Sequence, residues 1–123
     1  MKIVINRCFG GFSLSNEAFE LLLNKKHIRF ERVRAKSALR KELNEYDYYE
    51  EGYAGLDNHY LWEFNLCEDR SDPHLVAVVE ELGEKANGWA SDLTVVEIPD
   101  DVKWYIEEYD GREHVAEVHR TWS

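Results

Sequence analysis

Long apolar runs are absent from this sequence of 123 residues. None approaches the roughly 20 residues that cross a membrane. The apolar part of the opening segment, KIVINRCFGG, is too short and too strand-like for a signal peptide. Only two cysteines occur, Cys8 and Cys67, and they have no CxxC or Cys/His metal-binding spacing. We therefore expect a cytoplasmic protein with no membrane partner and with reduced cysteines, the alternative being a Cys8–Cys67 disulfide.

Motifs of catalysis are also missing. No Gly-x-Ser-x-Gly elbow is present, and the histidines have no HExxH or related spacing. Gly10–Gly11 match neither GxGxxG nor the phosphate-binding GxxxxGK[ST] motif. The sequence therefore predicts no cofactor and favours a protein without catalysis, although it does not exclude an enzyme.

Positive charge is scarce and unevenly placed. Fifteen basic against 25 acidic residues give a net charge of −10, which argues against direct binding to nucleic acid. Residues 25–41 are the exception, with eight basic residues and one acidic residue, a net charge of +7. This basic segment either attracts an anionic ligand or balances the acidic remainder within or between subunits.

Hydrophobic periodicity predicts alternating strands and helices. Strands are expected at 2–9, 27–35, 59–67 and 93–99, and a hairpin from strands 102–109 and 112–120. Helices are expected up to residue 26 after a cap at Ser13 or Ser15, at 37–52, and at 72–87, where Asp72 caps and Pro73 takes the first helical position. Asp110–Gly111 is the best hairpin turn in the sequence. The pattern predicts an α+β fold in a single domain, residues 1–123. We expect a mixed β-sheet with about three helices packed mainly on one face and a C-terminal antiparallel hairpin.

The predicted hairpin has a definite register. A two-residue turn places Tyr109 opposite Arg112 and Glu108 opposite Glu113. Like charges directly opposite are unfavourable, so this glutamate pair requires a cation, water or a nearby arginine. Glu113, Glu117 and His119 share one face, where they are weak candidates for a metal or acid–base site. The alternative is a solvated row of glutamates.

The first loop is the strongest candidate for ligand binding. A glycine-rich turn from a strand into a helix suits an anion, because helix N-termini carry unpaired N–H groups. The candidate ligand-binding residues are Asn6, Arg7, Gly10, Gly11, Ser13 and Ser15, joined by Arg120 and Trp122 if the C-terminal tail returns beside the loop. A plain tight turn with Phe12 packed inward explains the same loop, and Trp122 could instead anchor the C-terminus by packing.

Residues 42–60 interleave carboxylates with five tyrosines. The carboxylates are Glu42, Glu45, Asp47, Glu50, Glu51 and Asp57. Such a surface can imitate a phosphate backbone, with tyrosines that give rigid contact area at low entropy cost. The alternative is a helix with a solvated acidic side.

Three blocks of the sequence carry a resemblance. KIVINRCFGGFSLS, DPHLVAVVEELGEKANG and VEIPDDVKWYIEEYDGREHVAEVHRTW resemble a family of small, largely uncharacterised proteins of bacteriophages and prophages. Residues 25–65 lie outside these blocks, and a variable insertion would explain them. The resemblance implies a phage protein in the host cell cytoplasm, and small phage proteins often act against host defences. It implies no particular chemistry.

We therefore expect an accessory protein that sequesters a nucleotide-like anionic small molecule, such as a host defence signal, through the first loop. A homo-oligomer would suit this function, because a subunit border can join the basic segment to a neighbour's loop. The first alternative is an acidic inhibitor that occludes a nucleic-acid-binding host defence protein. The second is a metal-dependent enzyme that uses Glu113, Glu117 and His119.

Overall fold

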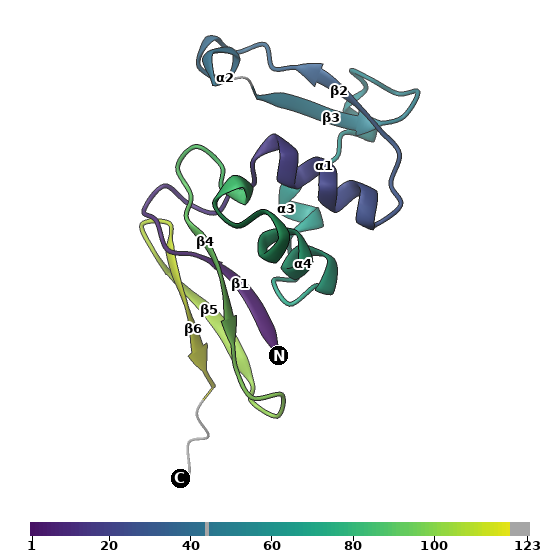
Figure 1. The fold of residues 1–123 in the computed structure, drawn as a ribbon. Helices are drawn as coiled ribbons and strands as arrows, with labels where there is room; N and C mark the ends of the chain where they lie inside the picture. Colours follow the sequence, from purple (N-terminus) through teal and green to yellow (C-terminus); the bar gives the residue numbers. More distant parts are fainter. Residues whose placement is uncertain (44, 119–123) are drawn as a thin grey trace.

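The computed structural model describes residues 1–43 and 45–118, in which six strands form three separate antiparallel pairs around a layer of helices. The elements are β1 (Lys2–Asn6), α1 (Asn16–Lys25), β2 (Phe30–Arg34), α2 (Ala38–Glu42), β3 (Tyr46–Glu50), η1 (Asp57–His59), α3 (Glu63–Leu66), α4 (Pro73–Leu82), η2 (Gly83–Ala86), β4 (Leu93–Glu97), β5 (Trp104–Tyr109) and β6 (Arg112–Glu117). Figure 1 shows β2, β3 and α2 above α1, α3 and α4, and β1, β4, β5 and β6 toward the lower left. The α+β class and the C-terminal hairpin are confirmed, with three antiparallel pairs in place of the expected mixed sheet.

Local capping signals determine the two longest helices. Ser15 caps α1 by accepting a hydrogen bond from the Ala18 N–H. Asp72 caps α4 by accepting from the His74 N–H, and Pro73 occupies the first turn. Gly83, with φ of 55°, ends α4 in a conformation that favours glycine. Both helices therefore begin at caps that the sequence predicts.

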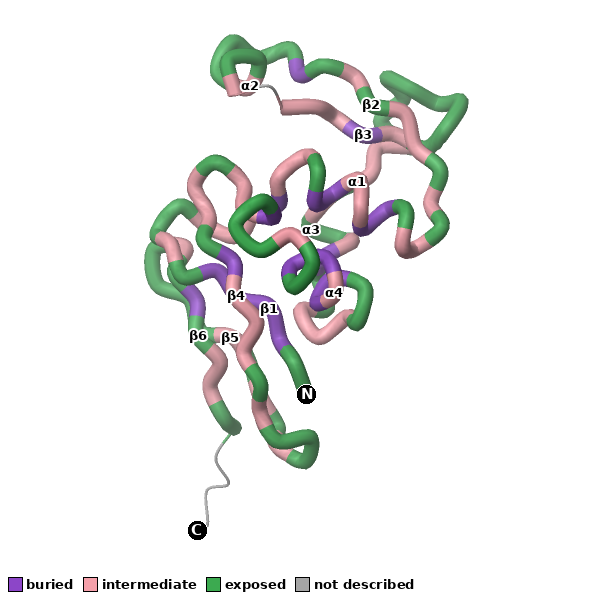
Figure 2. Tube along the Cα trace, in the orientation of Figure 1, coloured by how far each residue is buried: buried purple, intermediate pink, exposed green. Residues whose placement is uncertain are grey.

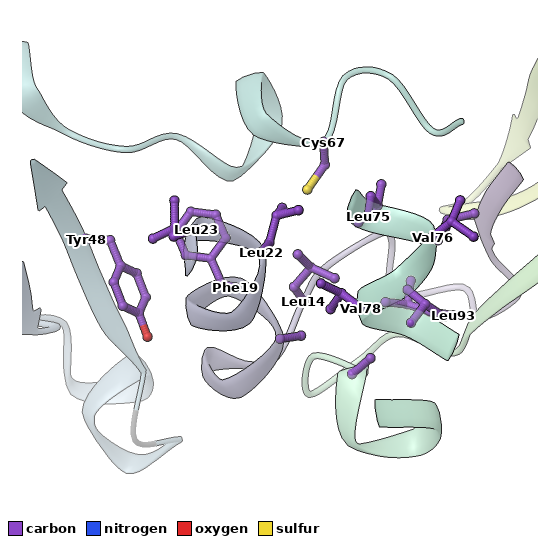
Figure 3. Close-up of a cluster of buried hydrophobic side chains, with 14 residues drawn as sticks. Leu14, Phe19, Leu22, Leu23, Tyr48, Cys67, Leu75, Val76, Val78 and Leu93 are labelled. Atoms are coloured by element: carbon purple, nitrogen blue, oxygen red, sulfur yellow. The ribbon is translucent and has the colours of Figure 1, made fainter. Parts of the chain in front are cut away.

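The core lies where α1 and α4 pack together above β1. Leu22, Leu23, Leu75 and Val78 are fully buried, as is Val4 of β1. Figure 3 shows Leu22, Leu75 and Val78 pointing into the space between the two helices. In Figure 2 the buried stretches follow α1, α4 and β1, whereas the outer turns are exposed. This helix pair is the base on which both outer layers rest.

The upper layer corrects the predicted helix at 37–52. Only residues 38–42 are helical, and residues 46–50 form strand β3, which pairs with β2. Tyr48 explains the change, because its buried ring packs 4.9 Å from the Phe19 ring and 5.6 Å from the Phe30 ring, measured between centroids. Tyrosines favour strands, and here they gain more by pairing with β2 than by continuing a helix.

The predicted strand at 59–67 is also wrong. Residues 60–62 run beside β3, with the Leu61 N–H bonded to the Tyr48 carbonyl, but residues 63–66 form the short helix α3. The period-two aromatics that indicated a half-buried strand are largely on the surface. Trp62 is 58% exposed and Phe64 78% exposed. The alternating aromatic residues of this segment therefore do not form a face that packs against the core.

The lower layer contains two antiparallel pairs. β1 pairs with β4, and β5 pairs with β6 in the predicted register, with Glu108 opposite Glu113 and Tyr109 opposite Arg112. Asp110 and Gly111 both have positive φ, as a two-residue hairpin turn requires. The Asn6 N–H donates to the Glu113 carboxylate and joins the end of β1 to β6. The first loop is thus held against the hairpin turn.

Candidate functional site

Asn6 holds the first loop in place. Its side chain is fully buried, and Nδ2 donates to the carbonyl oxygens of Cys8 at 2.7 Å and Gly111 at 2.8 Å. Its Oδ1 accepts from the N–H groups of Cys8 at 3.2 Å and Asp92 at 2.8 Å. Both polar atoms of the Asn6 side chain, Nδ2 and Oδ1, therefore form hydrogen bonds with backbone groups of the protein. The structure places this candidate ligand-binding residue inside the core, where it joins the loop, the hairpin turn and the start of β4.

The glycines of the loop allow close approach, but the approaching groups belong to the protein. A Cβ on Gly10 would lie 2.1 Å from the Ala90 carbonyl oxygen. A Cβ on Gly111 would lie 2.5 Å from the Gly11 nitrogen. Gly11 has open space around its Cβ position and a φ of +93°. The sequence signal for close backbone contact is thus explained by the packing of Gly10 on Ala90, which precedes β4, and of Gly11 on the hairpin turn at Gly111.

Glu113 lies in a buried ion pair. Arg70 contacts its carboxylate with both terminal nitrogens, at 2.6 and 2.9 Å, and the Asn6 N–H donates to the same carboxylate at 2.8 Å. The Arg70 guanidinium also lies 3.8 Å from the centroid of the Phe12 ring. Arg70 is therefore the nearby arginine that the Glu108–Glu113 pairing required. Sequence analysis did not identify it, because no local pattern links the segment before α4 to the hairpin.

Glu113, the first residue of the candidate metal site, is bonded to Arg70 in this ion pair. Glu117 lies at the end of β6 on the surface, and His119 lies outside the described residues. Within residues 1–43 and 45–118, no group of three or more His, Cys, Asp or Glu side chains could hold a metal ion. The described residues therefore give no support to the hypothesis of a metal-dependent enzyme.

A shallow pocket of about 540 Å³ lies beside the first loop. Its lining residues are Ile5, Arg7, Tyr109, Arg112, Glu113 and His114. We call it the arginine pocket. Tyr109 is 75% exposed at its rim, and the Arg112 guanidinium lies 5.8 Å from the centroid of the nearby Phe9 ring. The loop after β1 and strands β5 and β6 thus bring two arginines and the exposed Tyr109 ring to one pocket, and Phe9 lies near Arg112 outside its lining.

The arginines of this pocket differ from most other arginines of the described chain, which have carboxylate partners. In the part of the chain that the structure describes, neither Arg7 nor Arg112 has a carboxylate partner. His114 contacts Glu107 at 2.7 Å, and hydrogen bonds from Tyr105 and then His114 lower the pKa of that glutamate. Because the buried Glu113 is neutralised by Arg70, the pocket presents net positive charge on an acidic protein.

The basic segment 25–41 mainly balances charge inside the molecule. Its ion pairs are Lys25–Glu81, Lys26–Asp72, Arg29–Glu51, Arg32–Glu20, Arg40–Glu45 and Arg40–Asp47. Most of these partners come from other elements of the fold. Internal balance, one of the two interpretations of this segment, therefore accounts for most of its charge.

The same ion pairs neutralise much of the acidic stretch 42–60. Arg40 binds Glu45 at 2.8 Å and Asp47 at 2.9 Å, and the Tyr60 hydroxyl donates to Asp47. Glu50 lies 3.8 Å from His59. Glu51 pairs with Arg29, while Glu42 and Asp57 are exposed. Few of these carboxylates remain free to imitate a phosphate backbone.

Ser13 and Ser15 line a different cleft, of about 380 Å³, between the start of α1, strand β3 and residues 87–89. We call it the α1 cleft. The Ser15 hydroxyl donates to the Lys85 carbonyl and caps α1. Ser13 packs against Gly88, where a Cβ would lie 1.9 Å from the Ser13 hydroxyl oxygen. The structure therefore does not bring these serines into one pocket with Arg7.

Glu63 lies in the α1 cleft, and sequence analysis did not identify it. Its carboxylate accepts a hydrogen bond from the Leu14 N–H at 2.6 Å. Burial raises the pKa of this carboxyl to about 7, and the negative charge of Glu45 adds to the rise, while the Leu14 N–H and Arg70 oppose it. Glu63 is therefore only partly ionised near neutral pH.

This raised pKa predicts a pH-dependent stability. The folded state holds the Glu63 proton up to about pH 7, whereas the unfolded chain loses it near 4.5, so stability falls as pH rises through that window. Glu63→Gln keeps the acceptor for Leu14 but cannot ionise. We expect a melting temperature above wild type at pH 8, and a difference that becomes smaller as the pH is lowered towards 4.5. The exposed Glu68→Gln is the control, and an equal response of both variants would contradict the assignment.

The remaining sequence candidates are placed as follows. Arg120 and Trp122 lie outside the described residues, and Val118 bonds to the Lys103 carbonyl at the end of the hairpin away from its turn. Cys8 and Cys67 are free thiols. Burial raises the pKa of the Cys67 thiol to about 12, which disfavours the reactive thiolate.

The described geometry thus contains a cationic pocket, formed by Arg7 after β1 and by strands β5 and β6 with Arg112. None of the helices in residues 1–43 and 45–118 has the length and apolar character needed to span a membrane. Comparison of the chain with protein-family models, curated proteins and solved structures finds no match.

Proposed function

We propose that this protein binds a nucleotide-like anionic small molecule in the arginine pocket and sequesters it, as a phage or prophage accessory protein acting on a host defence signal. The observation that carries the proposal is the pair of arginines, Arg7 and Arg112, which line one pocket without carboxylate partners in the described chain. An acidic protein that leaves two cations together and unpaired retains local attraction for an anion.

The lining of the pocket indicates the ligand class. Guanidinium groups bind phosphate in a bidentate manner, so Arg7 and Arg112 suit one or two phosphate groups. Tyr109 and Phe9 offer exposed ring faces, on which a nucleobase can stack. A ligand with both a phosphate and a flat ring uses all of these groups, whereas inorganic phosphate uses only the arginines.

Sequestration requires affinity and abundance rather than chemistry. A pocket this shallow covers only part of a nucleotide, and a second copy of the chain would bury more of it. A homo-oligomer in which a neighbouring subunit closes the pocket is therefore part of the proposal. Native mass spectrometry after addition of a heated extract of phage-infected cells measures both properties. An added mass of nucleotide size on each subunit supports sequestration, and an apo mass in both samples argues against it.

Arginine variants test the site directly. We expect Arg7→Ala and Arg112→Ala each to weaken binding of ADP-ribose about tenfold to a hundredfold, because each removes charge-assisted hydrogen bonds. Isothermal titration with ADP-ribose, AMP and inorganic phosphate gives the dissociation constants and separates ring recognition from phosphate recognition. Lys41→Ala makes the same change in net charge on an exposed residue of α2. Equal losses in all three variants, or no binding of any probe by wild type, would refute the site.

A further inference from the structure

A second pocket, of about 480 Å³, lies on the other side of the Arg70–Glu113 ion pair. Its lining residues are Phe12, Glu63, Phe64, Cys67, Glu68 and Arg70. We call it the aromatic pocket. Phe64 is 78% exposed, the highest value among the large hydrophobic side chains of the described chain. Because Arg70 lines this pocket and Glu113 lines the arginine pocket, the ion pair forms part of the wall between them.

The charge of the aromatic pocket is opposite to that of its neighbour. Arg70 supplies the cation in its lining, and both of its terminal nitrogens are bonded to Glu113. Glu68 is exposed and has no cationic partner among residues 1–43 and 45–118. Glu63 contributes a second carboxyl group. An exposed aromatic ring therefore lies beside the Glu68 carboxylate, whose charge is not balanced within the pocket.

We propose that the aromatic pocket receives the guanidinium group of an arginine, presented by a basic segment of a partner protein. A guanidinium combines a flat, weakly hydrated face, which stacks on an aromatic ring, with an edge of donors that fits a carboxylate. Phe64 offers the ring and Glu68 the carboxylate. A lysine ammonium lacks the flat face, so an arginine is the better occupant.

The protein itself contains this arrangement next to the pocket. The Arg70 guanidinium lies 3.8 Å from the Phe12 ring centroid while its edge contacts the Glu113 carboxylate. The net charge of −10 adds long-range attraction for a basic partner. The occupant is thus argued from charge complementarity and from an internal example of the same contact.

This proposal does not rest on the nucleotide site, because the two pockets have no lining residue in common. Its test uses two fluorescein-labelled peptides, in which arginines or lysines alternate with Gly-Ser, and fluorescence anisotropy with the full chain. We expect Phe64→Ala and Glu68→Gln each to weaken binding of the arginine peptide about three- to tenfold, as loss of a cation–π contact or a paired charge does. The lysine peptide is expected to bind more weakly to wild type.

Matched controls separate the pocket from general attraction to an acidic protein. Glu84→Gln makes the same change in net charge as Glu68→Gln, and Tyr105→Ala removes another exposed ring. Both controls are expected to bind the arginine peptide like wild type, and all four variants to bind ADP-ribose like wild type. Equal weakening by Glu68→Gln and Glu84→Gln, or no change with Phe64→Ala, would overturn the proposal. If the wild type bound the arginine peptide as expected but did not bind ADP-ribose, only the proposed function would be contradicted.

Discussion

Arg70→Met is expected to lower the free energy of unfolding by about 3–5 kcal/mol, the usual cost of removing one partner from a buried ion pair. The Glu113 side chain is only 6% exposed, so its charge would remain in the interior without a counter-charge. Three partners are lost together, since Arg70 also donates to the Val4 carbonyl and stacks on Phe12. Urea denaturation of wild type and variant measures the difference.

A double variant identifies the buried charge as the cause. Glu113→Gln removes that charge but keeps an oxygen that can accept the hydrogen bond from the Asn6 N–H. Arg70→Met combined with Glu113→Gln should therefore be more stable than Arg70→Met alone, although each substitution alone is destabilising. A double variant that is less stable than either single variant would show that packing, rather than charge, dominates at this position.

Asn6→Ala is expected to cost about 3 kcal/mol, because it leaves four backbone groups without their partner. Those groups are the carbonyls of Cys8 and Gly111 and the N–H groups of Cys8 and Asp92. The affected segments include the first loop and the hairpin turn, so the arginine pocket should lose its shape as well. Loss of ADP-ribose affinity is expected in the same variant.

The control for Asn6 is Asn65→Ala, which changes an exposed asparagine in α3. It should unfold at the same urea concentration as wild type. Asn6→Asp adds a second comparison, since it keeps one acceptor oxygen but replaces the donating amide nitrogen by a second oxygen and buries a charge. If Asn6→Ala were as stable as wild type, water would have to replace all four hydrogen bonds.

Features encoded over a few neighbouring residues could be predicted from the sequence. The Asp72–Pro73 start of α4 and the Asp110–Gly111 turn depend on local backbone chemistry, and both are confirmed. This hairpin turn also fixes the register of β5 and β6, in which Glu108 lies opposite Glu113. The α+β class follows from the order of these elements.

Features that depend on distant partners could not be predicted. Tyr48 belongs to a strand because Phe19 and Phe30 surround its ring, and neither is near it in sequence. Arg70 neutralises Glu113 across the fold. A helical or strand periodicity in one segment carries no information about such partners, so tertiary packing overrides it.

The candidate site was predicted only in part, for a similar reason. The signals at Asn6 and Gly10 identify tight constraints on the chain, but not whether ligand or protein satisfies them. Arg7 was identified, whereas Arg112 gained its importance only when the hairpin placed it in the same pocket. Unpaired charge is a property of the folded molecule, and no sequence pattern reports it.

The pairing of β1 with β4 governs when this chain can fold during its synthesis. Ile3 pairs with Val96, and the amino group of Met1 donates to the Ile98 carbonyl. β1 leaves the ribosome before residues 7–92, and β4, its only hydrogen-bonded strand partner in the described chain, follows them. The native pairing of Lys2–Asn6 therefore closes late in folding, because it joins segments that are distant in sequence.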